Sequence, residues 1–86
     1  MNIHVSNLSL NIIDSDLRRL FAAFGEVSSA VIVRNLHNGR SRGTAFIDMY
    51  HEKNGEQAIL ALHHSTVDGK RISVTEIEYD PTRFKN

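Results

Sequence analysis

The chain has 86 residues, which is enough for one small domain and too few for two separate cores. Ten basic and ten acidic residues cancel, and this neutral balance argues mildly against a nucleic-acid binder. There is no cysteine, which excludes disulfides, zinc ribbons and thiol nucleophiles. Neither a signal peptide nor an apolar run long enough for a membrane is evident, so we expect a cytoplasmic protein without membrane contact.

The first third of the chain predicts a strand, a helix and a second strand. Apolar residues alternate with polar ones over residues 2–7, which is typical of a strand. Asp14 and Asp16 favour a helix start, because acidic groups stabilise the positive end of the helix dipole. Apolar residues then recur at helical spacing: Leu17, Leu20, Phe21 and Phe24. Gly25 ends the helix, and residues 27–34 predict the second strand.

The remainder predicts a hairpin, a second helix and a last strand. A turn signal at Asn38 and Gly39 precedes a third strand over residues 43–50. Residues 52–62 predict a helix, whose first turn Gly55 weakens by about 1 kcal/mol relative to alanine. The apolar residues expected to face inward from this helix are Ala58, Ile59, Ala61 and Leu62.

The last strand follows a turn at Asp68 and Gly69. We expect Ile72, Val74 and Ile77 on one face of it, with Ser73 and Thr75 on the other.

The order strand, helix, strand, strand, helix, strand predicts an α+β fold of the ferredoxin-like βαββαβ type. Two helices then pack on one face of a four-stranded antiparallel sheet, and the other face is open. Side chains expected on the open face are His4, Ser6, Val31, Val33, Thr44, Phe46, Asp48, Ser73 and Thr75. Phe46 is the large aromatic among them, and it is either exposed for stacking or covered by the C-terminal residues, which include Tyr79 and Phe84.

Two segments resemble the signature sequences of the RNA recognition motif. Residues 42–49, Arg-Gly-Thr-Ala-Phe-Ile-Asp-Met, are similar to its octapeptide, and residues 3–8, Ile-His-Val-Ser-Asn-Leu, to its hexapeptide. The similarity covers about residues 1–77 and is greatest to small bacterial proteins that consist of one such motif. The resemblance implies a motif domain over residues 1–78, a C-terminal tail over residues 79–86, and single-stranded RNA as the partner.

The resemblance also assigns roles to individual positions. In the family, aromatic residues on the two central strands stack bases and the first basic residue of the octapeptide pairs with phosphate. Arg42 takes the phosphate position and Phe46 one stacking position, whereas His4 and Thr44 replace two usual aromatics. A histidine ring can stack and threonine cannot, so we expect weak to moderate affinity and low specificity. The other expected RNA contacts are Ser6, Asn7, Arg40, Asp48, Ser73, Thr75 and, by analogy with the family, Glu76.

A protein-interaction module is the alternative function. A depleted aromatic platform, zero net charge and an apolar strip of Val31, Val33 and Phe46 are compatible with a protein partner or self-association on the same face, with RNA binding lost. Binding to RNA weakens with added salt and an apolar contact does not, so salt dependence separates the two hypotheses.

Catalysis and metal binding are not expected. Ser6, His4 and Asp48 share the flat open face, where no pocket would exclude water, so we expect no enzyme activity. His63 and His64 are adjacent and would point apart on a helix, although His64 at a helix end suits a positive φ. We therefore expect no metal, no cofactor and a monomer.

Overall fold

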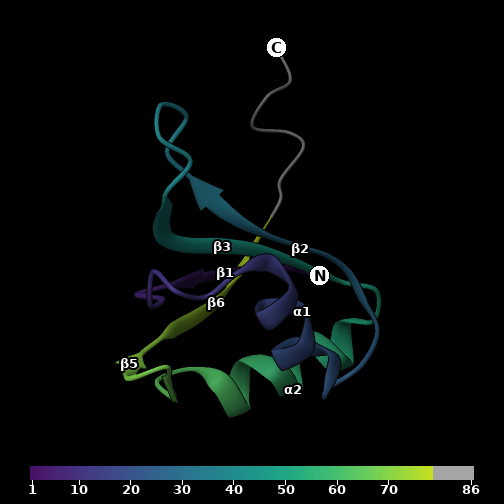
Figure 1. Ribbon diagram of the computed structural model, residues 1–86. Helices are drawn as coiled ribbons and strands as arrows, with labels where there is room; N and C mark the ends of the chain where they lie inside the picture. Colours follow the sequence, from purple (N-terminus) through teal and green to yellow (C-terminus); the bar gives the residue numbers. More distant parts are fainter. Residues whose placement is uncertain (79–86) are drawn as a thin grey trace.

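The protein forms one sheet backed by two helices, with a small hairpin beside them. The computed structural model describes residues 1–78. Its elements are β1 (Asn2–Ser6), α1 (Asp14–Ala22), β2 (Val27–Arg34), β3 (Ser41–Met49), α2 (Glu52–Leu62), β4 (Thr66–Val67), β5 (Lys70–Arg71) and β6 (Ser73–Ile77), shown in Figure 1. None of the helices among residues 1–78 is long and apolar enough to cross a membrane.

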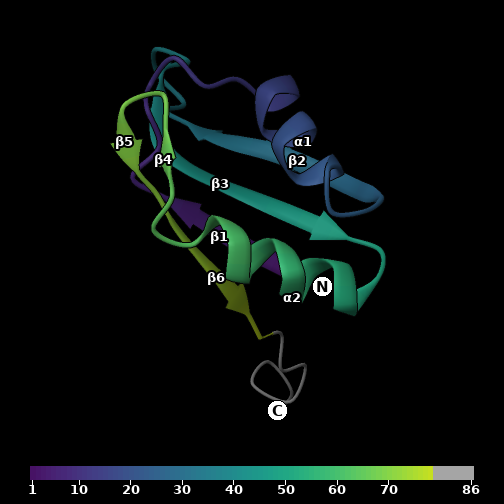
Figure 2. The ribbon, with the colours of Figure 1, turned by 90° about the horizontal axis from the view of Figure 1, so that it is seen from below.

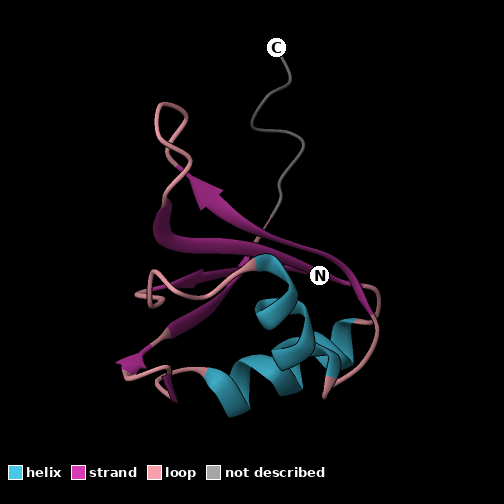
Figure 3. Ribbon diagram, in the orientation of Figure 1, coloured by secondary structure: helices cyan, strands magenta, loops and turns pink. Residues whose placement is uncertain are grey.

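The sheet has the strand order β2-β3-β1-β6, and every neighbouring pair is antiparallel. Both helices lie on one face of it, α1 along β2 and α2 toward β6 (Figures 2 and 3). No element within residues 1–78 covers the opposite face, which we call the open face. The predicted ferredoxin-like α+β fold is confirmed.

The core lies between the sheet and the helices. Alternate strand residues are buried against the helices, among them Ile3 and Val5 of β1 and Ile47 of β3, none more than 1% exposed. Leu17 and Phe21 of α1 meet them from the other side. Because side chains alternate along a strand, the residues between these apolar positions are placed on the open face.

Several predicted boundaries and orientations differ from the structure. The first strand ends at Ser6, because Asn7 takes a left-handed conformation with φ 59°. Ala61 is exposed rather than inward-facing. Ile77 falls on the same side of β6 as Ser73 and Thr75, since the strand keeps a strict two-residue alternation that places Val74 opposite.

Gly55 has a packing role that the helix pattern did not indicate. It is buried in α2, which begins at Glu52 as predicted, and a Cβ on it would overlap the Met1 side chain. A glycine that lowers helix propensity therefore makes room for the Met1 side chain against α2.

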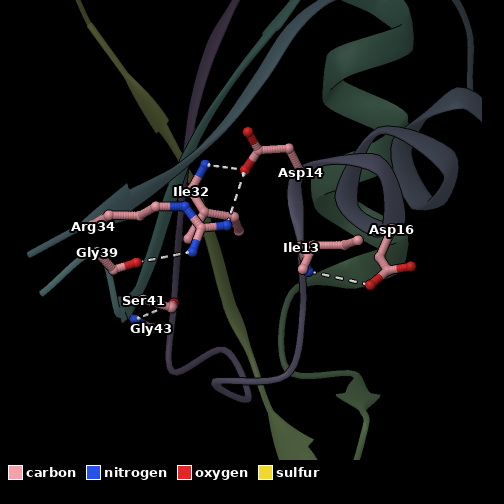
Figure 4. A network of polar contacts seen from close by, with 8 residues as sticks. All are labelled: Ile13, Asp14, Asp16, Ile32, Arg34, Gly39, Ser41 and Gly43. Carbon is pink, nitrogen blue, oxygen red and sulfur yellow. Dashed lines mark hydrogen bonds and ion pairs between the residues drawn. The ribbon is translucent and has the colours of Figure 1, made fainter.

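The outer edge of β2 is covered by polar side chains of α1. Asp14 Oδ1 accepts the Ile32 N–H at 2.9 Å and lies 4.0 Å from Arg34 Nη2 (Figure 4). Arg18 Nη1 donates to the Val27 carbonyl at 2.9 Å. The backbone groups of an edge strand are unpaired and can recruit other strands, so these contacts protect β2 from edge-to-edge pairing.

Candidate nucleic-acid interface

A row of four side chains crosses the open face from one edge of the sheet to the other. The strand register pairs Val31 of β2 with Phe46 of β3, Phe46 with His4 of β1, and His4 with Thr75 of β6. The row therefore joins residues that are far apart in the sequence, and it places Phe46 and His4 on the two central strands.

Phe46 and His4 form an aromatic pair in the middle of this row. Their ring centroids are 5.3 Å apart with an angle of 48° between the planes. Phe46 is 49% exposed and His4 is half-buried. Tyr79 and Phe84, the residues suggested as a cover for Phe46, lie outside the described residues. Within the described part of the chain, both rings keep surface free for a planar ligand.

Polar side chains flank the aromatic pair on both sides. Ser6 faces Ser73 across β1 and β6, and Thr44 lies two residues before Phe46 on β3, all three half-buried. On the other side, Asn2 pairs with Asp48, whose Oδ1 lies 3.5 Å from the Met1 amino group. This ammonium reduces the charge repulsion that Asp48 would exert on a phosphate.

Sequence reasoning did not single out Asn2 and Ser29 as open-face residues. Both pair with Asp48 in the register, and both are exposed. The alternation along β1 and β2 was the signal that could have found them, since Asn2 precedes His4 by two residues and Ser29 precedes Val31 by two.

Two of the predicted contact residues are placed differently from the expectation. Asn7 leaves the strand, and its Nδ2 donates to the Arg71 carbonyl at 2.7 Å, so one of its two amide N–H groups is already engaged. Glu76 pairs with the buried Ile3 and lines a groove with residues of α2, on the helix side of the sheet. Because Glu76 shares the orientation of Val74, it does not face the open side, and the RNA contact expected for it stays a prediction.

Arg40 and Arg42 are exposed at one end of the open face. Arg42 precedes Thr44 and Phe46 by two and four residues, so the alternation along β3 directs it toward the same face. Neither guanidinium has an ion pair or a hydrogen bond with any residue in the range 1–78. Arg34, by contrast, is held by Asp14 and by the Gly39 carbonyl (Figure 4). Two arginines are thus free to contact an anion.

The β2–β3 loop, residues 35–40, is ordered by its own hydrogen bonds. Asn35 Oδ1 accepts the N–H groups of His37 and Asn38, and Asn38 Oδ1 accepts the Arg40 N–H at 2.9 Å. The Asn35 N–H donates to the Arg40 carbonyl at 2.8 Å. The loop therefore holds Arg40 in a defined position beside β3.

A glycine at the start of β3 fixes the path of the chain past β1. Gly43 has φ 77° and is buried, and its carbonyl accepts the Leu8 N–H at 2.9 Å. A Cβ at this position would lie 3.1 Å from the Leu8 carbonyl oxygen. Both the positive φ and the close approach favour glycine here, between Arg42 and Phe46 on β3.

The histidines are not gathered with other metal-ligating side chains among residues 1–78. No cluster of metal-ligating side chains is present there, and no side-chain hydrogen bond joins His4 to Ser6 or Asp48. The expectation that His63 and His64 point apart is wrong, because both residues leave the helical conformation and their rings stack at 3.7 Å. The expected positive φ of His64 is confirmed at 66°.

A family model described as RNA recognition motif matches residues 3–73. The chain belongs to the RNA recognition motif family. A 28 kDa chloroplast ribonucleoprotein of Spinacia oleracea is 38% identical over 81 residues, which are 94% of this chain and 35% of that protein. The chain thus spans about a third of this curated relative.

Two further proteins match this RNA recognition motif over most of their own length. A candidate RNA-binding protein, RbpD, of the cyanobacterium Nostoc sp. is 34% identical over 76 residues, covering 88% of this chain and 81% of the relative. The crystal structure of RNA binding protein PG1 superposes with a TM-score of 0.90 at 34% identity, covering 94% of this chain and 98% of PG1. The predicted similarity to small bacterial proteins with a single RNA recognition motif is therefore confirmed.

Proposed function

We propose that this RNA recognition motif binds single-stranded RNA across the open face of the sheet. Bases stack on Phe46 and His4, and Arg42 and Arg40 hold the backbone phosphates. The observation that carries the proposal is the aromatic pair itself, with one ring from each central strand and centroids 5.3 Å apart. Stacking on an aromatic side chain contributes about 1–3 kcal/mol per base and tolerates every base.

The composition of the platform limits affinity and specificity. Thr44 offers no ring where the family has an aromatic, so one stacking contact is lost. The polar groups available around the platform are mostly hydroxyls, with the carboxylate of Asp48 and the side-chain amide of Asn2. The hydroxyls belong to Ser6, Ser29, Thr44, Ser73 and Thr75. Hydroxyls donate and accept equally well and discriminate poorly between bases. We therefore assign weak to moderate affinity with low sequence preference, and no catalytic step.

The alternative is a protein-interaction module that uses the same face. It is favoured by one observation, which is that Val31 and Phe46 are paired across β2 and β3 and are 53% and 49% exposed. Such a contiguous apolar strip also suits a protein surface. The free guanidinium groups of Arg40 and Arg42 beside it favour the RNA hypothesis, because a nucleic-acid backbone supplies their counter-charges.

An NMR titration with a short single-stranded RNA of mixed sequence tests the proposal. We expect amide shifts at His4, Phe46 and Thr75 and in the β2–β3 loop, with no shifts on the exposed faces of α1 and α2. Rising salt weakens this binding steadily, whereas a contact with an apolar protein surface is insensitive to salt. An absence of shifts at millimolar protein and RNA contradicts RNA binding.

A further inference from the structure

The β2–β3 loop carries one apolar side chain, Leu36, that no other part of residues 1–78 covers. Leu36 is 99% exposed. The hydrogen bonds of Asn35 and Asn38 hold the loop in a defined shape, so Leu36 is presented at a fixed position. Exposing a leucine side chain to water is unfavourable, and burying it against a complementary apolar surface would be favourable.

The surroundings of Leu36 are basic. The segment from Arg34 to Arg42 contains three arginines and His37, and no acidic residue. Within residues 1–78, Arg40 and Arg42 form no ion pair. A surface that receives Leu36 should therefore be apolar at its centre and acidic at its rim.

A groove with that composition lies between α2 and β6 of the same chain. This α2–β6 groove is an open depression of about 360 Å³, lined by Ile59, Leu60, Glu56 and Glu76. Leu60 is 84% exposed, so no residue in the range 1–78 covers this apolar side chain. The two glutamates among the lining residues supply the acidic charge.

The loop and the groove lie at opposite ends of the molecule. In Figure 1 the loop between β2 and β3 projects at the top of the view, and α2 lies at the bottom. The register agrees, because Glu76 pairs with Ile3 and Ile3 with Ile47, far along β3 from its start at Ser41. The two surfaces cannot meet within one chain, so any contact between them joins two molecules.

We propose that copies of this chain associate head to tail, with Leu36 of one copy seated in the α2–β6 groove of the next. Arg40 of the first copy then faces Glu56 and Glu76 of the second. The contact joins two different surfaces, so it produces an open row or a closed ring of copies and not a two-fold symmetric dimer. The zero net charge of the chain removes the long-range repulsion that would oppose this association.

The contact is weak and does not depend on the proposed RNA binding. One leucine and a few exposed charge pairs correspond to a dissociation constant in about the millimolar range, so the chain is monomeric at micromolar concentration. The groove lies on the helix side of the sheet and leaves Phe46 and His4 accessible. Failure of one proposal therefore leaves the other intact.

Paramagnetic labelling without RNA tests the contact directly. The chain has no cysteine, so His37→Cys gives a single attachment site for a nitroxide in the loop. We expect spin-labelled, unenriched protein to broaden the amide signals of Ile59, Leu60 and Glu76 in a separate ¹⁵N-labelled copy at millimolar concentration. Leu60→Ser should reduce the association about tenfold or more, because it removes an exposed apolar side chain of the groove and leaves the core unchanged.

A charge exchange between two variants provides the matched test. Arg40→Glu and Glu56→Arg should each weaken self-association about fivefold when studied alone. An equal mixture of the two variants should recover the association, because the acidic loop of one variant faces the basic groove of the other. Glu26→Arg, an equal charge reversal outside the groove, is the control. Mixing it with Arg40→Glu should not recover the self-association.

Three outcomes overturn the head-to-tail contact. One is the absence of intermolecular broadening at millimolar concentration, and another is broadening confined to the open face. The third is a groove whose signals are perturbed independently of concentration by residues 79–86 of the same chain.

Discussion

At the scale of single residues, Phe46 and His4 provide the aromatic surface on the open face that is available for base stacking. The strand pairing places them side by side, and the 49% exposure of Phe46 means that its ring contributes little to the core. A substitution at Phe46 should therefore change RNA affinity without a large change in the free energy of unfolding, which makes this position the most direct one to mutate.

Phe46→Ala should weaken RNA affinity by about 1–3 kcal/mol, or roughly 5- to 150-fold, because one stacking surface is lost. The free energy of unfolding should change little, since the ring is half-exposed. Fluorescence anisotropy with a labelled RNA and urea unfolding measure the two quantities. Leu60→Ala on α2 is the control, with unchanged RNA affinity at micromolar protein. A large loss of stability in Phe46→Ala would indicate a packed ring instead.

Thr44→Phe should raise RNA affinity, because it adds a ring two residues from Phe46 on the same face of β3. The gain expected for one further stacked base is about 1–3 kcal/mol. Thr44→Val removes the hydroxyl without adding a ring, and should leave affinity nearly unchanged. Equal affinities for the two variants in the same anisotropy assay would contradict a stacking role for this position.

The sequence predicted Phe46, Thr44 and Asp48 on one face of β3, because alternation within a long strand is reliable. It misplaced Ile77, whose face follows from the two-residue alternation that begins at Ser73. The hydrogen bond from Asn7 to the Arg71 carbonyl was not predicted, because it joins residues 64 positions apart and has no local pattern.

At the scale of elements, the two edge strands of the sheet are protected in different ways. Side chains of α1 cover β2, whereas β6 is attached to the end of α2 by the Val74 N–H, which donates to His63 Nδ1 at 2.9 Å. Neither contact has a signature in the hydrophobic pattern, so neither was predicted. Each links a helix to an edge strand, and each can be tested through stability.

Asp14→Ala should destabilise the fold by about 1–2 kcal/mol, because the Ile32 N–H loses its acceptor on the edge of β2. Asp14→Asn keeps an oxygen acceptor and should recover most of this loss. Urea unfolding monitored by circular dichroism measures both. If the two variants were equally unstable, the charge of Asp14 and not its hydrogen bond would be responsible.

The stacked histidines make stability depend on pH. The pKa of His64 lies below its ordinary value of 6.5, first because positive charge on His63 opposes protonation, and further through desolvation and Arg71. The unfolded chain therefore binds more protons than the native state when the pH is below about 6.5, so stability falls as the pH decreases through this window.

Comparing urea unfolding at about pH 5 and about pH 7.5 measures this effect. His64→Asn should reduce the difference between the two pH values, since asparagine does not titrate and tolerates the positive φ. An unchanged difference in this variant would show that other groups cause the pH dependence.

At the scale of the whole molecule, charge is distributed unevenly although its sum is zero. Arginines gather around the β2–β3 loop, whereas Glu56 and Glu76 lie together in the α2–β6 groove. The neutral balance argued mildly against nucleic acid, but RNA experiences the local field of Arg40 and Arg42 and not the net charge.

Arg42→Gln should weaken RNA binding to all sequences and reduce the slope of log affinity against log salt by about 0.7, the contribution of one phosphate contact to a single strand. Lys70→Gln removes one positive charge from β5, away from the platform, and should leave the slope unchanged. Anisotropy titrations at several salt concentrations measure the slopes. Equal slopes for both variants would remove Arg42 from the interface.

The order of elements and the core were predictable because each element carries its own signal. The stripe of α1, the alternation of β3 and the turn at Asn38 and Gly39 together define the βαββαβ order. The small β4–β5 hairpin was missed, because two-residue strands around Asp68 and Gly69 are too short to show a period.

The Asn38–Gly39 sequence also affects how long a purified sample remains covalently unchanged. Asparagine followed by glycine is prone to deamidation, in which the glycine nitrogen attacks the side-chain carbonyl and an aspartate or isoaspartate results. Here the Gly39 nitrogen is engaged with the Asn35 carbonyl at 2.8 Å, and Asn38 Oδ1 is held by the Arg40 N–H. The folded loop thereby resists a spontaneous ageing reaction that would introduce an acidic group among its arginines.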